Sequence, residues 1–283
     1  MSRTRPLLAL VAAVALMLSV AACGSSSSDA GSPSTTRAPA GTSTTVASSA
    51  APIEILVSND DGYSAKGIDT LVEALRKEKG VKVTVVAPNV DRSGTGGKTS
   101  DGQVEVADVK TISGYPAKSV SGYPADAVDV AMNQLGIQPD VIIAGINMGP
   151  NVGPSVDISG TVGAARAAVE NGVPALATSQ GLGTVVDFDA AVPFILDWLH
   201  QHRAAIAAGK EPVAVTNLNV PSCDTGKIRG LEETTADLKG DFGAALAKQD
   251  CTSTAAASSL QGDVELFTNG FATITPVAAR PAS

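Results

Sequence analysis

Two apolar, β-branched runs with one amphipathic helix between them constrain the fold most strongly. Residues 53–57 and 81–87 are rich in Val and Ile, which is typical of strands buried on both faces of a parallel sheet. Between them, residues 67–79 repeat apolar side chains at three- and four-residue spacing, and Gly80 ends the helix. This order predicts a right-handed βαβ unit.

The following sequence continues the same alternation. Further strands are expected at 141–144, 175–178, 213–220 and 270–276, the last as an edge strand, and further helices at 124–135, 160–171 and 188–202. Residues 104–120 alternate apolar and polar side chains, which predicts a small hairpin inserted in the pattern. The fold class that follows is α/β, with a mostly parallel sheet flanked by helices, a small β-hairpin and a C-terminal extension.

The first 22 residues have the pattern of a secretory signal peptide. Arg3 and Arg5 precede an apolar run that ends in small residues, and the run is too short and wrongly flanked for a transmembrane helix. Residues 20–24, Val-Ala-Ala-Cys-Gly, resemble a bacterial lipobox, which would make Cys23 the lipid-modified N-terminus. An ordinary signal peptide with a nearby cysteine is the alternative, and the polar run at 25–29 favours lipidation. We therefore expect export and lipid anchoring at the outer face of the cytoplasmic membrane, at the bacterial cell surface or in the periplasm.

Residues 23–52 have the composition of a flexible tether. They are rich in Ser, Thr, Ala, Pro and Gly and show no apolar period, so they bury too little surface to offset the entropy of ordering. The folded domain is then expected at 53–283, a length that suits one α/β domain. Its Cys223 and Cys251 form a candidate disulfide in an exported chain, and two free thiols are the alternative.

The charge of the chain restricts its partners. The formal net charge is −8 and the sequence has no basic patch, which argues against a nucleic-acid polymer. A small phosphorylated substrate is compatible with this charge if a metal supplies local positive charge.

Two adjacent carboxylates, Asp60 and Asp61, follow the first expected strand directly. Like charges in a crevice stay ionised only when a cation lies between them or water reaches them. The pair therefore indicates a divalent-metal site at the carboxyl end of the strand. A solvated turn is the alternative, because Asn, Asp and Gly are the usual turn residues.

Two more polar loops follow expected strands, at 89–100 and 145–153. Ligands of open parallel sheets bind at the carboxyl ends of the strands, so these loops should meet the carboxylates in one crevice. They supply Ser93, Asn147 and Asn151. Hard oxygen ligands of this kind suit Mg²⁺, Mn²⁺ or Ca²⁺ and do not suit zinc.

A helix start rich in small residues follows at Ser159, Gly160 and Thr161. Free backbone N–H groups and the positive end of the helix dipole make such a start an anion site, and a metal beside it suits a phosphate ester. Simple N-capping by Ser159 is the alternative.

Four stretches in order carry a resemblance to one family. They are 58–62 (Ser-Asn-Asp-Asp-Gly), 87–88 with 92–94 (Ala-Pro, Arg-Ser-Gly), 145–153 (Gly-Ile-Asn-Met-Gly-Pro-Asn-Val-Gly) and 159–162 (Ser-Gly-Thr-Val). Together they resemble the SurE family, the stationary-phase survival proteins, which are metal-dependent 5′/3′-nucleotidases. Residues 122–126 and 272–276 are similar to further blocks of that family. Each motif alone is weak, but four in this order are highly specific.

The resemblance implies a role for each matched position. Asp60, Asp61, Ser93 and Asn147 match the ligands of one divalent metal, Mg²⁺ or Mn²⁺. Asn147, Asn151, Ser159, Gly160 and Thr161 match residues around the phosphate, and Asp60, Asp61 and Asn151 are the candidate catalytic residues. The family fold is a Rossmann-like α/β sheet with extensions used in assembly, which implies a homodimer or homotetramer. The sequence departs from the family at the site's rim, where Thr95-Gly96-Gly97-Lys98 replaces a Ser/Asn-rich tail.

The expected activity is hydrolysis of nucleoside 5′(3′)-monophosphates to nucleoside and phosphate. In-line attack by water, with Asp60 or Asp61 accepting the proton, is the expected chemistry, and a covalent aspartyl-phosphate is the alternative. A non-catalytic, extracytoplasmic lipoprotein that binds nucleotides or phosphate is the alternative function.

Overall fold

The computed structural model describes residues 52–281. The predicted signal peptide at 1–22, the lipid-attachment residue Cys23 and all but the last residue of the predicted tether lie outside the described residues. Within the described part of the chain, no helix combines the length and apolar character needed to cross a membrane.

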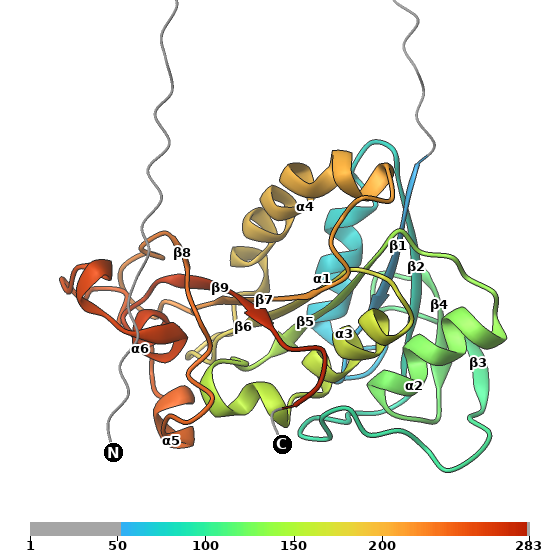
Figure 1. Cartoon of the computed structure of the whole chain (residues 1–283), viewed down its shortest axis with the longest axis horizontal. Helices are drawn as coiled ribbons and strands as arrows, with labels where there is room; N and C mark the ends of the chain where they lie inside the picture. Colours follow the sequence, from blue (N-terminus) through green and yellow to red (C-terminus); the bar gives the residue numbers. More distant parts are fainter. Residues whose placement is uncertain (1–51, 282–283) are drawn as a thin grey trace, which may run out of the picture. The chain divides into compact units, whose positions relative to one another are not determined.

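A single mixed sheet organises the described chain (Figure 1). Its strands are β1 (Ile53–Ser58), β2 (Val81–Pro88), β3 (Val106–Lys110), β4 (Pro116–Val120), β5 (Val141–Met148), β6 (Ala175–Gln180), β7 (Val215–Val220), β8 (Leu231–Glu233) and β9 (Ala272–Val277). Their order across the sheet is β3-β4-β2-β1-β5-β6-β7-β9-β8. The run from β4 to β7 is parallel, whereas β3 and β9 are antiparallel to β4 and β7. The predicted α/β class with a mostly parallel sheet is therefore confirmed.

Helices cover both faces of this sheet (Figure 1). The α-helices are α1 (Lys66–Leu75), α2 (Pro124–Asp129), α3 (Gly160–Glu170), α4 (Val192–Ala207), α5 (Phe242–Ala245) and α6 (Gly262–Thr268). Short 3₁₀ segments lie at Gly153–Asp157, Phe188–Ala190 and Ala257–Ser259, and a π-helical segment continues α2 over Val130–Gln134. Helices α1 and α4 pack on one face of the sheet and α2 and α3 on the other, each against its own apolar cluster.

Strand β1 lies at the centre of the sheet and connects the two clusters. Ile55 and Val57 pack toward α1 and α4, while Leu56 between them packs toward α2 and α3. Neighbours β2 and β5 pair with it in parallel, so its backbone is hydrogen-bonded on both sides. The residues that follow β1 therefore leave the sheet at its middle, where a parallel sheet binds ligands.

Several predicted boundaries are wrong. Strand β5 continues through residues 145–148, which the sequence pattern assigned to a loop, because glycine and asparagine hide the strand signal there. Helix α1 ends at Leu75, earlier than the predicted 79, and the predicted helix at 124–135 changes to a π-helical segment after Asp129.

The predicted position of the last strand is also wrong. Strand β9 is not an edge strand, because it lies between β7 and the three-residue β8. Strand β8 belongs to the segment 222–263, where the sequence shows no regular period. It is too short to produce a detectable alternation.

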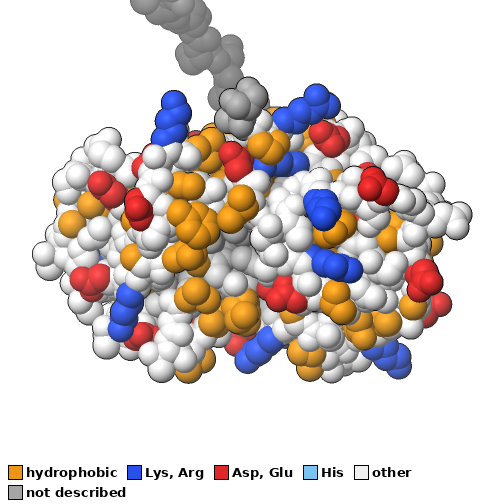
Figure 2. Space-filling model, turned by 90° about the horizontal axis from the view of Figure 1, so that it is seen from below, with side chains coloured by type: hydrophobic (Ala, Val, Ile, Leu, Met, Phe, Trp, Pro, Cys, Tyr) orange, Lys and Arg blue, Asp and Glu red, His pale blue; other side chains and the backbone are white. Residues whose placement is uncertain are grey.

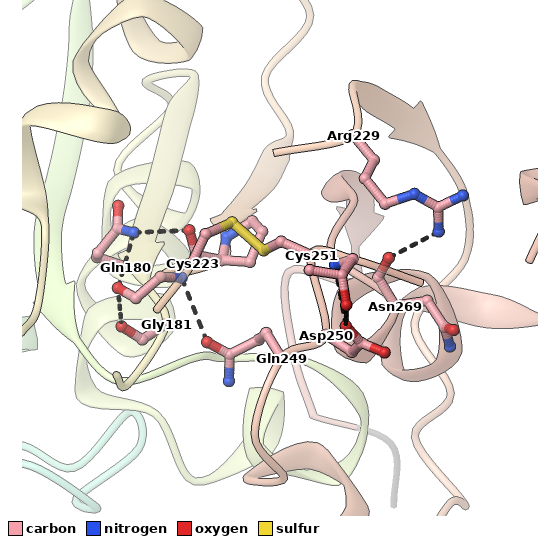
Figure 3. The surroundings of a disulfide bond; sticks show 11 residues. Gln180, Gly181, Cys223, Arg229, Gln249, Asp250, Cys251 and Asn269 are labelled. Atoms are coloured by element: carbon pink, nitrogen blue, oxygen red, sulfur yellow. Dashed lines mark hydrogen bonds between the residues drawn. A yellow bond between two sulfur atoms is a disulfide. The ribbon is translucent and has the colours of Figure 1, made fainter. Parts of the chain in front are cut away.

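Cys223 and Cys251 are joined by a disulfide, 28 residues apart in the sequence (Figure 3). Around it, the Ser222 backbone N–H donates to Gln249 Oε1 at 3.2 Å, and the Ser222 hydroxyl donates to the Gly181 carbonyl. The bond therefore fastens the segment before α6 to the chain that leaves β7.

Replacing both disulfide cysteines by serine should lower the free energy of unfolding by about 3–4 kcal/mol, because the unfolded chain regains the entropy of a loop of that length. Urea unfolding of the wild type, with and without reductant, measures the loss. The double variant serves as the control and should not respond to reductant. Equal stability of wild type and double variant would contradict the prediction.

Candidate functional site

The first part of the site is the turn that follows β1. Asn59 closes it by donating its Nδ2–H to the Gly62 carbonyl at 3.1 Å, and the Arg92 backbone N–H donates to the Asp60 carbonyl at 2.7 Å. The Asp60 side chain is only 2% exposed. The stretch is thus a turn, but the alternative of a solvated turn is wrong for Asp60.

Asp60 lies against the first turn of α3. The Thr161 hydroxyl donates to Asp60 Oδ1 at 2.5 Å. A Cβ atom at Gly160 would lie 2.7 Å from Asp60 Cβ and 2.8 Å from its Oδ2, so only glycine permits this approach. Ser159 caps the helix by accepting the Val162 backbone N–H at 3.0 Å. The N-capping that the sequence analysis gave as the alternative is therefore present, and the helix presents its positive end to a carboxylate.

Asp61 is held by the end of β5. Its Oδ2 accepts the Met148 backbone N–H at 3.0 Å, which brings the carboxylate beside the chain at Asn147. The Asn147 side chain is buried and donates its Nδ2–H to the Gly149 carbonyl at 2.6 Å. The strand ends of β1 and β5 thus meet as predicted.

A third carboxylate, Asp91, completes a concentration of negative charge. Burial raises the pKa of Asp61 to about 7, with the charges of Asp60 and Asp91 adding to the effect. Burial also raises the pKa of Asp60, against the lowering effect of its hydrogen bond from Thr161. In the described structure, none of the three carboxylates forms an ion pair with a lysine or arginine.

The sequence analysis did not identify Asp91 as a site residue. Its carboxylate determines where the Ser93 hydroxyl is directed. The Ser93 hydroxyl and backbone N–H both donate to Asp91 Oδ1 at 2.7 Å. Ser93 is exposed, and its hydroxyl is directed to Asp91 rather than hydrogen-bonded to Asp60 or Asp61. The signal for Asp91 was present as an Asp-Arg-Ser turn directly after β2.

Asn151 is placed differently from the carboxylates. Its Nδ2–H donates to Ser179 Oγ at 2.8 Å, its backbone N–H donates to Asn219 Oδ1 at 2.7 Å, and its carbonyl accepts from Asn217 and Asn219. These contacts make Asn151 a buried anchor between the site loop and strands β6 and β7. The one sequence signal for these hydrogen bonds was the pair of alternating asparagines in β7, Asn217 and Asn219.

A buried acid, Asp263 at the start of α6, holds the far end of the same loop. It accepts the backbone N–H groups of Gly153 and Asp237, each at 2.9 Å. Its burial raises its pKa. Sequence reasoning missed Asp263, because it lies in the irregular C-terminal segment and no spacing connects it to the site.

The donor set fits a hard divalent cation. Buried carboxylates with raised pKa values and no basic partner require a cation to ionise together. Asn59 adds a buried Oδ1 without a hydrogen-bond partner. In the described residues, no three His, Cys, Asp or Glu side chains are arranged to hold a metal, so a metal here needs neutral oxygens as well. Ser93 and Asn147 supply oxygens of that kind.

Known proteins resemble the chain over most of its described length. The family described as "Survival protein SurE" matches residues 55–241. The 5′-nucleotidase SurE of Prochlorococcus marinus (strain AS9601) is 40% identical over 192 residues, which cover 66% of this chain and 70% of that protein. The 5′-nucleotidase SurE of Syntrophobacter fumaroxidans is 38% identical over 184 residues, covering 64% and 72%.

One solved structure supports the fold. The crystal structure of the SurE protein from Aquifex aeolicus aligns with a TM-score of 0.63 at 23% identity. The alignment covers 81% of this chain and 95% of that chain.

Replacing Gly160 by alanine should displace Asp60 or the start of α3 and lower the free energy of unfolding by about 1–3 kcal/mol, as overpacking does. Gly97→Ala is the matched control, because a Cβ there meets no atom within 4 Å. Urea unfolding of both variants measures the difference. A Gly160→Ala protein as stable as Gly97→Ala would contradict the described contact.

Proposed function

Because the chain belongs to the SurE family, we propose that it is a 5′-nucleotidase that uses one divalent metal to hydrolyse nucleoside monophosphates. The observation that carries the proposal is the burial of Asp60 against the glycine start of α3, beside a second carboxylate, Asp61. This arrangement combines a cation site with a helix N-terminus, which together suit a phosphate ester. The relatives named as nucleotidases favour turnover over the alternative of a non-catalytic binding protein.

We assign the metal to Asp60, Asp61, Ser93 and Asn147, with Mg²⁺ or Mn²⁺ as the ion. Asp60 and Asp61 are fixed by α3 and by the end of β5, so they are oriented before an ion binds. Asn147 lies next to the residue that holds Asp61. A bound divalent ion at these oxygens supplies positive charge to a phosphoryl oxygen and lowers the pKa of a nearby water.

The phosphate is assigned to the start of α3. Gly160 and Thr161 bring backbone N–H groups and the positive helix end to the site, and Ser159 adds a hydroxyl. These donors stabilise charge that develops on the equatorial oxygens during in-line attack. Asn147 near the end of β5 and Asn151 in the loop after it are assigned to the same phosphate, and Asn151 holds that loop in place through its buried contacts.

Asp60 and Asp61 are the candidate proton acceptors. Burial raises the pKa of Asp61 to about 7 in the metal-free protein, and a bound cation would lower it by favouring the ionised form. Water attack by this route yields nucleoside and phosphate. A covalent aspartyl-phosphate on either residue is the alternative, and rapid-quench trapping of a labelled protein distinguishes the two routes.

We also propose that the chain is exported and lipid-anchored through Cys23, and that it assembles as a homodimer or homotetramer. The signal-like residues 1–22 and the lipobox support the first proposal. Family membership supports the second, and light scattering of the purified protein tests it.

The proposed activity predicts phosphate release from AMP that depends on added Mg²⁺ or Mn²⁺. Asp60→Asn should reduce kcat/KM by at least about a hundredfold, because it removes one ligand charge while keeping an oxygen that can accept from Thr161. Colorimetric phosphate release with EDTA and with each metal measures this. Release by the wild type that is no better than release by Asp60→Asn would overturn the enzyme assignment.

The raised pKa of Asp61 predicts a pH-dependent response to metal. A carboxyl whose pKa is raised by folding contributes stability that is present below its unfolded pKa, near 4, and is lost as pH rises to about 7. A metal that needs the ionised carboxylate must displace a proton below pH 7, so its affinity should fall by up to about tenfold per pH unit there.

Thermal unfolding tests this response to metal. Saturating Mg²⁺ should raise Tm more at pH 8 than at pH 5.5, and Asp61→Asn should lose this difference. An equal rise at both pH values in the wild type would contradict the prediction.

The lipid anchor predicts processing at Cys23. Expression in a bacterial host should give a membrane-bound form whose electrophoretic mobility shifts when signal peptidase II is inhibited by globomycin. Cys23→Ala should abolish the shift and release the protein from the membrane fraction. If globomycin does not change the mobility of the wild-type chain, the lipid anchor is excluded.

A further inference from the structure

Two basic side chains on the loop after β2 lie over one aromatic ring. The Arg92 guanidinium carbon is 5.2 Å from the centroid of the Tyr123 ring, and Lys98 Nζ is 4.8 Å from the same centroid. Neither side chain forms an ion pair with a carboxylate in the described part of the chain. Arg92 donates to the Ser121 carbonyl through Nη2, and its buried Nε has no partner. The loop thus gathers two positive charges over one ring, and the Asp101 carboxylate acts on Lys98 without forming an ion pair with it.

The protein holds this loop in place at three points around the proposed phosphate site. The Arg92 backbone N–H donates to the Asp60 carbonyl, and the Gly96 N–H donates to the Ile158 carbonyl at 2.8 Å. At the other end, the buried carboxylate of Asp126 accepts the hydroxyl of Ser100 at 2.7 Å and the backbone N–H of Tyr123 at 2.7 Å. Asp126 therefore fixes both the backbone of Tyr123 and the loop at Ser100, two residues after Lys98.

The pair of basic residues lies close to the start of α3. A Cβ at Gly163 would lie 2.1 Å from the Gly96 carbonyl oxygen, so the loop rests directly on the first turn of the helix. A Cβ at Gly160 would lie 3.1 Å from Pro124 Cγ, and Tyr123 is the residue before Pro124, about 3.8 Å of backbone away. The loop that carries Arg92 and Lys98, and the residue that follows Tyr123, therefore both pack against the first turn of α3, where the proposed phosphate donors lie.

The charge of the surroundings makes this pair selective for an anion. The chain carries a net charge of −8, and on the face seen in Figure 2 basic side chains stand singly or in small groups among acidic ones. The Tyr123 hydroxyl, and more weakly the charge of Asp101, raise the pKa of Lys98, and the charge of Arg92 opposes them weakly. Two cations lie over one ring. They match a doubly charged group, and arginine and lysine together are common phosphate ligands.

We propose that Arg92, Lys98 and Tyr123 form a subsite for a second phosphoryl group, and that the preferred substrate is a nucleoside 3′,5′-bisphosphate. This inference rests on the proposed nucleotidase function. One phosphate occupies the start of α3 beside Asp60, and the other, one ribose away, contacts the basic pair. Hydrolysis of one ester consumes a water and releases inorganic phosphate and a nucleoside monophosphate.

Isomeric ligands test the subsite in the purified full-length protein. Adenosine 3′,5′-bisphosphate and ADP carry the same groups and differ in where the second phosphate lies, while AMP lacks it. The wild type should show a kcat/KM about tenfold higher for the bisphosphate than for AMP, and ADP should gain less. Lys98→Met should bring the bisphosphate-to-AMP ratio close to one, and Lys98→Arg should restore it.

A second lysine controls for net charge. Lys82 pairs with Glu54 near the opposite end of β1 and β2, so Lys82→Met removes the same charge far from the site and should leave the ratio unchanged. A ratio near one in the wild type, or a ratio that Lys98→Met does not lower, overturns the subsite. If kcat/KM relative to AMP rises more for ADP than for the bisphosphate, the proposed placement of the second phosphate one ribose away is wrong.

Calorimetric binding in EDTA separates this inference from the proposed function. The bisphosphate should bind the metal-free wild type about tenfold more tightly than AMP, and Lys98→Met should lose that advantage. If AMP is not hydrolysed but the binding difference depends on Lys98, the nucleotidase assignment fails and the subsite stands. If AMP is hydrolysed but the binding difference is absent, the subsite fails and the nucleotidase assignment stands.

Discussion

The contact between Asp60 and the first turn of α3 is the interaction on which the rest of the site depends. It joins residues 101 positions apart, and it requires glycine at position 160 and a hydroxyl at position 161. The same contact aligns the end of β1 with the positive end of a helix. A carboxylate at 2% exposure is costly in a folded chain, and here hydrogen-bond donors offset part of that cost, as would the divalent cation that we propose at this site.

Charge explains why the surrounding loops are built as they are. Burial raises the pKa values of Asp60 and Asp61, and the charge of Asp91 adds to both, which destabilises the metal-free fold at neutral pH. Two backbone N–H groups hold these residues in place: that of Met148 donates to the Asp61 carboxylate and that of Arg92 donates to the Asp60 carbonyl. Asp263 and Asn151 connect the loop after β5 to the C-terminal part of the chain. The geometry of the site is therefore set by backbone contacts that do not depend on a bound ion.

The sequence predicted the parallel sheet and part of the candidate site, and the physical reasons can be named. β-Branched runs predicted β1 and β2, and the rule for strand ends brought Asp60, Asp61 and Asn147 together. It failed where the signal is nonlocal. Strand β8 has three residues, residues 145–148 continue a strand in spite of two polar side chains, and Asp263 reaches Gly153 across 110 positions. Asp91 was overlooked because a turn acid beside Ser93 has no period, and only the folded structure brings its charge close to Asp60 and Asp61.

Anomalous diffraction from crystals grown with Mn²⁺ tests the central claim most directly, because it locates the ion without relying on turnover. The account predicts one strong peak between the carboxylates of Asp60 and Asp61, within coordination distance of Asn147, and its loss in crystals of Asp60→Asn. An ion bound elsewhere in the domain, or an empty position between the two carboxylates at saturating Mn²⁺ and pH 8, would contradict it.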